Sequence, residues 1–543
     1  MNYPKESDFM TDKSSSAENT LSNTLANELL IEVNKAKIAT ASILTEIVMK
    51  DINKNSIAAV DKVLHTKIGK DYLSAADNGT LEKQAGMVPS IASTGRTRRA
   101  FWKGRADPWA HVDPKKFPQG KKKMILLTVS LAGFIGPLST TIYYPALETI
   151  QRDLDTTETL VNATLSMFTF FMAFFPLIWA SFSDRYGRRN LYLISFIIYI
   201  LGSIGCALSN NIALLIIFRG ISAAGVSSTM SLGAGTLADI FYPEERGAAF
   251  AWYTCGPLLG PAVGPIIGGY IDQAWGYHGI FWFLAAFSAI VLFLMFVFLP
   301  ETWRRVHNLP APGEKENHKK SVNPFASLEL LKFPNMRVLV VYVAFVFMFM
   351  YLNNTAFTRT YTLQYGLSAG QVGLCYLAQA AGSILGGITG GKCSDRVYKE
   401  TVARNGGVGW PEMRLGGIFM WVGVVVMALA FAAYGWTVQE NAHWAWGLLC
   451  QFVLGFSLMS PNIVINTYLA DCFKSRSASA TACNNFVRYI TAGVGALVAS
   501  VLVDKLGNGV LYSICGGILL AAAPLLFIVY WNGRKWSALR EAL

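Results

Sequence analysis

Long apolar runs and short polar linkers alternate along the chain from residue 124 to residue 531. A run of about twenty apolar residues crosses ~30 Å of hydrocarbon as a helix, and buried helices of soluble domains rarely run so long without a charge. The pattern therefore predicts an all-α polytopic membrane protein. Its twelve transmembrane helices are expected near 124–147, 159–181, 190–208, 211–237, 248–270, 280–299, 337–361, 371–391, 415–434, 444–468, 478–502 and 508–531.

Lysine and arginine gather in every second linker. The linkers after the second, sixth and eighth runs are basic, whereas the linker after the first run is acidic. The stretch 96–123, before the first run, carries ten Lys or Arg against two Asp. Because basic residues stay on the cytoplasmic side of a membrane, we expect an even number of spans with both termini in the cytoplasm.

A long polar linker divides the spans six and six. Residues before the first span are poor in large apolar side chains, which predicts disorder. We expect five parts: a disordered cytoplasmic tail at 1–120, an N-terminal six-helix bundle at 121–299, a cytoplasmic central loop at 300–336, a C-terminal six-helix bundle at 337–531 and a cytoplasmic tail at 532–543.

Two short strings recur at equivalent places in the two halves. Ser183-Asp184-Arg185 returns as Ser394-Asp395-Arg396, and Leu237-Ala238-Asp239 returns as Leu469-Ala470-Asp471. Two independent matches indicate a duplicated six-helix unit.

The amino-acid composition argues against several classes of protein. Hydrophobic residues make up 53% of the chain and charged residues 15%, whereas soluble domains carry roughly 25% charged residues. The net charge of +12 comes without a groove-reading motif and lies largely beside the spans, so we expect a lipid bilayer and no nucleic acid as partner. The eight cysteines form no CxxC pair and have no histidine at ligand spacing, which predicts neither a disulfide framework nor a metal site.

Catalytic strings are absent from the sequence. It contains no HExxH, GxSxG or Walker string, so we expect no catalytic residue, no cofactor and no direct use of ATP. No apolar segment precedes residue 124, so the first span is expected to serve as the insertion signal. A transporter is the leading interpretation; a transport-dead receptor and, least favoured, a membrane-embedded enzyme are the alternatives.

Three motifs carry a family resemblance. Residues 180–190, ASFSDRYGRRN, resemble the signature between helices two and three of the major facilitator superfamily, usually written GxLaDrxGrr, with Ala180 replacing the leading glycine. Residues 256–269 in the fifth run are similar to the glycine-proline signature of that superfamily's drug:proton antiporters. Arg219 matches the arginine of a further motif, although the Gln and Gly that usually follow are Ser222 and Ala223 here.

Two more stretches resemble fungal twelve-span drug:proton antiporters of the quinidine-resistance subgroup: LPETWRR at 299–305 and YLADCFKSRSASATACNN at 468–485. The likeness covers about residues 115–535. It implies the major facilitator fold and proton-coupled export of amphipathic or cationic small organic compounds, that is multidrug efflux, by a monomer in the plasma membrane. Import of a specific nutrient or metabolite on the same fold is the alternative.

The turn after the second span is the first candidate site. We expect its charges to form a conformational latch that holds the outward-open state and breaks on inward opening; positive-inside anchoring is the alternative. The residues are Asp184, Arg185, Gly187 and Arg188. Asp395 and Arg396 are expected to form a weaker latch in the second half, where the glycine and the paired arginine are missing.

The fifth span is the second candidate site. Its glycines recur every four residues on one stripe, and its prolines remove amide donors and favour a bend. The motif comprises Gly256, Pro257, Gly260, Pro261, Gly264, Pro265, Gly268 and Gly269. A packing seam is the plain interpretation, and the family resemblance adds a bend that prevents leakage.

Polar residues within the spans form the third group. Arg219 is expected to tune a nearby proton site or hold substrate, with snorkelling to the interface as the alternative. Arg488 either resembles Arg219 or lies near the cytoplasmic edge, and the first span offers no acid as proton carrier. Aromatic walls with few charges favour amphipathic substrates over sugars. The substrate-binding candidates are Asn353, Asn354, Gln379, Asn462 and Asn466.

Overall fold

The computed structural model describes residues 113–302, 324–473 and 476–537. The side chains of Asp184 and Arg185 are not among those described, and the predicted tail and central loop lie largely outside these ranges. Every regular element in the described ranges is a helix. The prediction of an all-α membrane protein is therefore confirmed.

The N-terminal half begins at a short 3-10 turn whose N-cap, Asp113, accepts a hydrogen bond from the amide of Lys115. Asn211 caps a later helix in the same way through the amide of Leu214. The helices of this half are α5 (Gln119–Thr141), η2 (Tyr144–Ala146), α6 (Leu147–Asp153), α7 (Glu158–Tyr186), α8 (Arg188–Ala207), α9 (Ile212–Val226), α10 (Ser228–Ile240) and α11 (Pro243–Phe298).

The C-terminal half follows a 3-10 segment, η4 (Pro324–Lys332). Ser368 and Gln371 form a capping box at the start of one helix, each satisfying a backbone amide of the other. The helices of this half are α12 (Pro334–Arg359), η5 (Thr360–Gln364), α13 (Ala369–Arg404), η6 (Pro411–Gly416), α14 (Ile418–Gln439), α15 (Trp444–Cys472), α16 (Ser477–Leu506) and α17 (Asn508–Asn532).

The connection between the fifth and sixth predicted spans needs a correction, because both lie in α11. Eleven helices in the described ranges are long and apolar enough to cross a membrane, one of them being Trp252–Phe298. That stretch of 47 residues is about 70 Å long at 1.5 Å per residue, more than twice the hydrocarbon thickness. Gly276, with φ 68° and ψ −179°, interrupts it. The two runs predicted at 248–270 and 280–299 are thus joined by a one-residue break instead of a loop, and twelve crossings remain.

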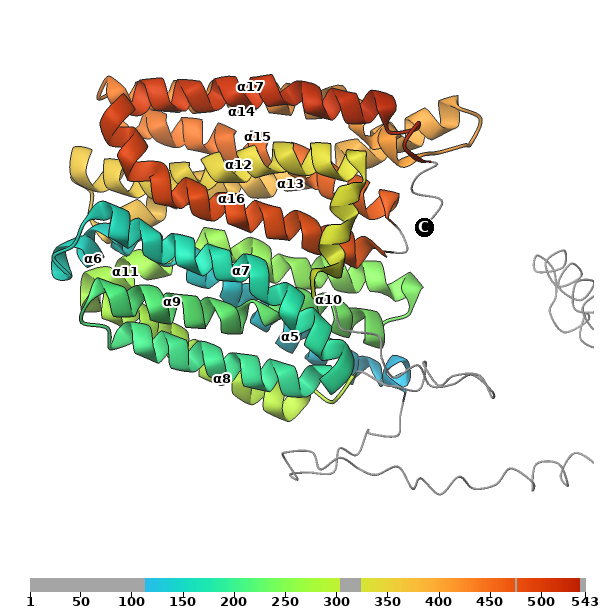
Figure 1. Cartoon of the computed structure of the whole chain (residues 1–543), viewed down its shortest axis with the longest axis horizontal. Helices are drawn as coiled ribbons and strands as arrows, with labels where there is room; N and C mark the ends of the chain where they lie inside the picture. Colours follow the sequence, from blue (N-terminus) through green and yellow to red (C-terminus); the bar gives the residue numbers. More distant parts are fainter. Residues whose placement is uncertain (1–112, 303–323, 474–475, 538–543) are drawn as a thin grey trace, which may run out of the picture. The chain divides into compact units, whose positions relative to one another are not determined.

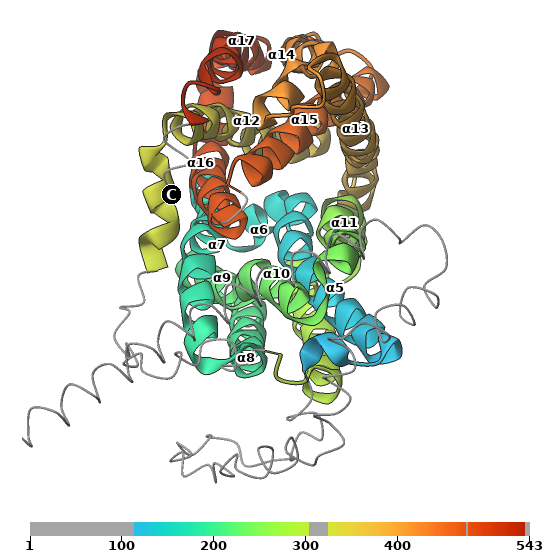
Figure 2. The same ribbon diagram turned by 90° about the vertical axis from the view of Figure 1, so that its right-hand side faces the viewer.

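The helices gather into two groups that lie side by side, α5 to α11 in one and α12 to α17 in the other (Figure 2). The chain enters at α5 and leaves at α17 from the same end of the bundle (Figure 1). This end also holds the α7–α8 junction and is called the Arg188 end. The opposite end, where α12 finishes, is called the Arg359 end.

Packing of α11 on α5 explains the glycine stripe. A Cβ at Gly256 would lie 2.5 Å from the carbonyl oxygen of Ser130, and a Cβ at Gly260 would lie 2.7 Å from Cβ of Pro137. Only glycine allows backbones to approach so closely. The backbone stays helical through the three prolines of the motif, and its non-helical residue in α11 is Gly276.

Candidate functional site

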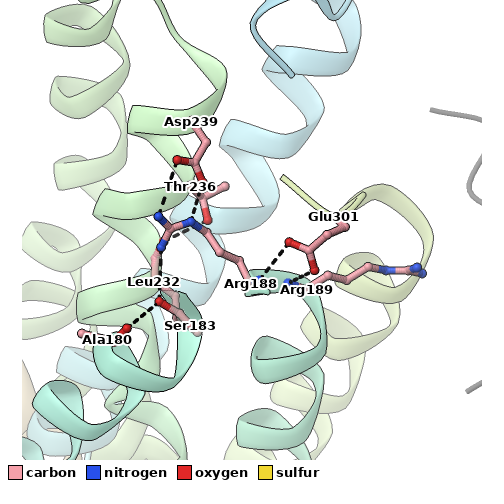
Figure 3. Close-up of polar contacts among 8 residues, drawn as sticks. All are labelled: Ala180, Ser183, Arg188, Arg189, Leu232, Thr236, Asp239 and Glu301. Carbon is pink, nitrogen blue, oxygen red and sulfur yellow. Dashed lines mark hydrogen bonds and ion pairs between the residues drawn. The ribbon is translucent and has the colours of Figure 1, made fainter. Parts of the chain in front are cut away.

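Arg188 lies at the centre of a polar cluster at the Arg188 end (Figure 3). Its Nε donates to Oδ2 of Asp239, at the end of α10, over 2.5 Å, and its Nη1 donates to the Ser183 hydroxyl over 3.4 Å. The two charged side chains are 12% and 23% exposed, so solvent screens this ion pair only partly. Arg188 therefore ties α8 to α7 and α10.

Glu301 completes this cluster from the end of α11. Its carboxylate accepts hydrogen bonds from the backbone amides of Arg188 (2.9 Å) and Arg189 (3.2 Å), the first residues of α8 (Figure 3). A carboxylate at a helix N-terminus satisfies free amides and favours the helix dipole. Gly187 has φ 89°, and a Cβ there would lie 2.5 Å from Oε2 of Glu301, so this turn requires glycine.

The C-terminal half has an equivalent cluster around a different arginine. Arg414, from η6, donates to Asp395 and to Asp471, each over 2.7 Å. Burial would lower the pKa of Arg414, but the hydrogen bonds and charges of the two aspartates outweigh it and raise the pKa. Arg396 is exposed. Arg414 is thus the described cation beside Asp395, and the latch expected of Asp395 and Arg396 stays a prediction.

The described contacts of both clusters stay within their own halves. The described partners of Arg188 come from the N-terminal half, and those of Arg414 from the C-terminal half. The predicted contributions of Asp184 and Arg185 lie outside the described side chains. The described contacts therefore stabilise each half separately.

Hydrogen bonds and ion pairs between the halves, among the described residues, gather toward the Arg359 end. Arg359, at the end of α12, forms an ion pair with Glu158, the first residue of α7, and donates to Oε1 of Gln151 over 2.7 Å. One turn along α7, the amide of Asn162 donates to the Ser500 hydroxyl of α16 over 3.1 Å. Each of these contacts joins the N-terminal half to the C-terminal half.

More contacts continue this interface toward the middle of the bundle. The Ser166 hydroxyl donates to the carbonyl oxygen of Gly493 over 2.7 Å, and the rings of Tyr144 and Tyr376 stack with centroids 5.7 Å apart. A cavity of about 170 Å³ adjoins the interface, lined on one side by Glu158 and on the other by residues of α12, η5 and α16.

Arg219 is buried within the N-terminal half. Its side chain is 1% exposed and one nitrogen, Nη1, donates to the carbonyl oxygen of Ser139 over 3.2 Å. The guanidinium carbon lies 4.4 Å from the ring centre of Tyr143 and 4.2 Å from that of Phe168. Nε and Nη2 have no hydrogen-bond partner among the described residues. In this structure the side chain does not reach a solvent-exposed surface.

The substrate-binding candidates fall into two sets in the C-terminal half. Asn353 exchanges two hydrogen bonds with Gln451, at 3.1 and 3.0 Å. Asn354 is buried, and its Oδ1 has no described partner. Gln379 is buried on α13.

The second set forms a chain of amides between α15 and α16. Asn484 donates to Asn466 over 3.1 Å, and Asn466 donates to Asn462 over 3.4 Å. Asn484 was not among the candidates, although it lies four residues before Arg488, on the same helix face. That spacing was visible in the sequence.

Other functional residues had no local signal. Asp239 and Glu301 lie 51 and 113 residues from Arg188, and Glu158 lies about 200 residues from Arg359. The duplicated Leu-Ala-Asp string was the one hint that Asp239 and Asp471 have equivalent roles.

Comparisons with known proteins agree with this architecture. Residues 129–490 match the model of the Major Facilitator Superfamily. The chain is 32% identical over 462 residues to the MFS-type transporter phiD of a fungal species, covering 78% of this chain and 70% of that protein. It is 28% identical over 555 residues to the MFS antiporter QDR3 of Candida albicans, covering 78% and 79%.

A solved structure shares the fold. The bacterial homologue of the human lysosomal transporter Spinster, in an inward-facing and unoccupied conformation, superposes with a TM-score of 0.58 at 16% identity, covering 77% of this chain and 99% of that one. Two six-helix groups and the motifs at 180–190 and 256–269 are thus explained together: the chain belongs to the major facilitator superfamily of membrane transporters.

Proposed function

We propose that the protein exports amphipathic small organic compounds across the plasma membrane in exchange for protons, without covalent change to the compound. The observation that carries this proposal is the distribution of contacts between the halves. The described hydrogen bonds between them involve residues 151–166 of one half and 359–500 of the other, whereas the described contacts of Arg188 and Arg414 each stay within one half.

Such a distribution suits alternating access. Two separately stabilised halves whose polar contacts gather toward one end can rock about a site between them and expose it to each side in turn. Because basic linkers favour the cytoplasmic side of a membrane, we propose that the Arg188 end faces the cytoplasm. The described conformation is then closed toward the outside, with the Arg188–Asp239 pair intact. The transporter can therefore close toward the outside without breaking the Arg188–Asp239 pair. We propose that the Arg188 and Arg414 clusters keep each half rigid.

The similarity to an antiporter supports exchange rather than uniport. Exchange with protons needs a group that binds a proton, and we propose Asp272 of α11. It is 5% exposed; Oδ2 accepts a hydrogen bond from Thr149 over 2.7 Å, while Oδ1 has no described partner. Arg152 and Asp153 are the charged groups close enough to act on it. Gly269, three residues before Asp272, packs against Ala369 of the other half, so the access of Asp272 to water would change when the halves move apart.

Transport in proteoliposomes tests the proposed function. The purified full chain is reconstituted without ATP, a pH gradient is imposed, and flux of labelled amphipathic compounds is measured in both directions. We expect flux that follows the gradient and stops when an ionophore collapses it. Liposomes without protein are the control. Flux in the direction of the protons would indicate import instead, and no gradient-dependent flux of any compound would contradict the proposal.

A further inference from the structure

Two arginines lie far from the ends of apolar helices, one in each half. Arg488 lies eleven residues after the start of α16, about 16 Å along that helix. Arg219 lies seven residues into α9, about 10 Å from its start. Both arginines lie within stretches that are long and apolar enough to cross about 30 Å of hydrocarbon, Ile212–Ile240 and Ser479–Leu506, so we assign both guanidinium groups to the membrane-spanning part of the bundle.

Neither guanidinium has a counter-charge among the described residues. The polar contact of Arg219 is the carbonyl oxygen of Ser139. Arg488 is half-buried and contacts aromatic rings, at 4.7 Å from the centre of Phe347 and 5.0 Å from that of Tyr489. Arginine stays charged at any cellular pH. An unpaired charge at this depth is costly, and such residues usually face a partner or a pathway.

Acidic residues of the described helices lie elsewhere. Asp239, Asp471 and Asp504 are each within two residues of a helix end, and Asp272 lies four residues before the break at Gly276. Asp395 belongs to the Arg414 cluster. A cation at mid-depth would therefore meet two arginines and no described carboxylate, which disfavours the cationic part of the expected substrate range.

Aromatic side chains connect the two arginines. Tyr144 lies near both Arg219 and Tyr351, and Tyr351 in turn lies near Arg488. The ring of Phe168, beside Arg219, is carried by α7, which contacts α16 through Ser166. Both guanidinium groups thus flank the interface between the halves.

Amides add hydrogen-bonding capacity beside Arg488. Asn484 lies one helical turn before it, and its Oδ1 has no described partner. The chain of Asn466 and Asn462 continues from Asn484 across to α15. The planar guanidinium groups can donate paired hydrogen bonds to a carboxylate or a sulfonate. The neighbouring aromatic rings offer a surface for the apolar part of a ligand.

We propose that a site between the halves, bounded by Arg488 and Arg219, binds an amphipathic organic anion, with its acidic group held by Arg488 and, as the halves rearrange, by Arg219. This proposal rests on the proposed export function, for which it names the substrate class. The ligand supplies the negative charge that the described helices lack at mid-depth. An inorganic anion such as chloride carries the same charge but has no apolar part. The test below distinguishes a site for amphipathic organic anions from a site for inorganic anions.

Binding of three matched probes tests the inference without transport. The full chain in detergent is titrated with 1-pyrenebutanoate, the neutral 1-pyrenebutanol and the cationic 1-pyrenebutylamine, followed by energy transfer from tryptophan to pyrene. We expect the anion to bind at least about tenfold more tightly than either relative, since a charge-assisted bond exceeds a neutral one. Chloride at moderate concentration is expected to compete weakly.

Variants test whether Arg488 holds the acidic group of the ligand. Arg488→Ala should lower the affinity for pyrenebutanoate about tenfold or more and remove the preference for this anion over pyrenebutanol. Arg488→Lys should keep part of the preference, because the positive charge remains. Arg337→Ala, which removes an exposed arginine at the start of α12, should change nothing. Monodisperse elution on size exclusion confirms that each variant is folded.

Each outcome is decisive. Equal or tighter binding of the cation, or unchanged anion binding in folded Arg488→Ala, would overturn the inference, as would full competition by chloride. The transport assay decides the proposed function separately. Gradient-driven export of cations alone would support export and overturn the anion site, whereas anion binding without any flux would support the site and overturn export.

Discussion

Removal of the Arg359 side chain should open the end of the transporter that this structure holds closed. Arg359 is joined to Glu158 and Gln151, both from the other half, and these contacts lie where the halves meet. Arg359→Ala removes both of them while leaving the contact between Asn162 and Ser500 in place. We expect a shift toward the conformation that is open at the Arg359 end.

The size of the shift follows from the burial of the pair. The side chains of Arg359 and Glu158 are 11% and 30% exposed. Exposed ion pairs contribute up to about 1 kcal/mol, while loss of one partner from a buried pair costs roughly 3–5 kcal/mol. A partly screened pair falls between these limits, at about 1–2 kcal/mol, which corresponds to a roughly 5- to 30-fold change in the ratio of open to closed molecules.

Hydrogen–deuterium exchange measured by mass spectrometry on the protein in nanodiscs reports this shift. Peptides from the start of α7 and the end of α16 should exchange faster in Arg359→Ala than in the unmodified protein. The combined exchange Arg359→Glu with Glu158→Arg should restore part of the protection. Lys332→Ala, which breaks the exposed Lys332–Glu329 pair, is the control and should change neither peptide. Unchanged exchange in Arg359→Ala would refute the assignment of this pair to outer closure.

Three further predictions follow from the same contacts. Asp239→Asn should lower the stability of the detergent-solubilised protein by about 1 kcal/mol, because it weakens the partly screened pair with Arg188; thermal unfolding measures this, and an unchanged Tm would contradict it. Gly260→Leu should prevent correct packing of α11 on α5, whereas Gly517→Leu, with open space around the glycine, should be tolerated; equal yields on size exclusion would argue against a packing role. Asp272→Asn should abolish the pH dependence of flux in proteoliposomes with normal insertion, and retained dependence would place the proton site elsewhere.

The helices could be predicted from the sequence because hydropathy depends on each residue's own chemistry. Apolar runs predicted most helix ends within a few residues, although α13 continues thirteen residues beyond its predicted end at 391, and small residues at four-residue spacing predicted the contact face of α11. The break at Gly276 was missed, since a polar stretch between two apolar runs looks the same whether it forms a loop or a single kinked residue.

The partners of charged residues could not be predicted in this way. Nothing near Arg188 indicates that Glu301, 113 residues later, accepts hydrogen bonds from the start of α8. Similarly, Arg414 lies outside the repeated string that contains Asp395, yet it supplies the cation of the second cluster. Such pairs are set by where the fold brings helix ends together, which depends on every helix at once.

One pair of equivalent positions in the two halves carries different residues, and this difference bears on function. Arg219 lies twenty residues before Asp239, and Gln451 lies twenty residues before Asp471. Gln451 and Asn353 satisfy each other with two hydrogen bonds, whereas two guanidinium nitrogens of Arg219 have no described partner. A satisfied neutral pair stabilises its own packing, while an unpaired charge raises the free energy until a ligand or a new conformation supplies a partner. We therefore expect binding at the N-terminal position to change the balance between conformations, while the C-terminal position keeps α12 and α15 together.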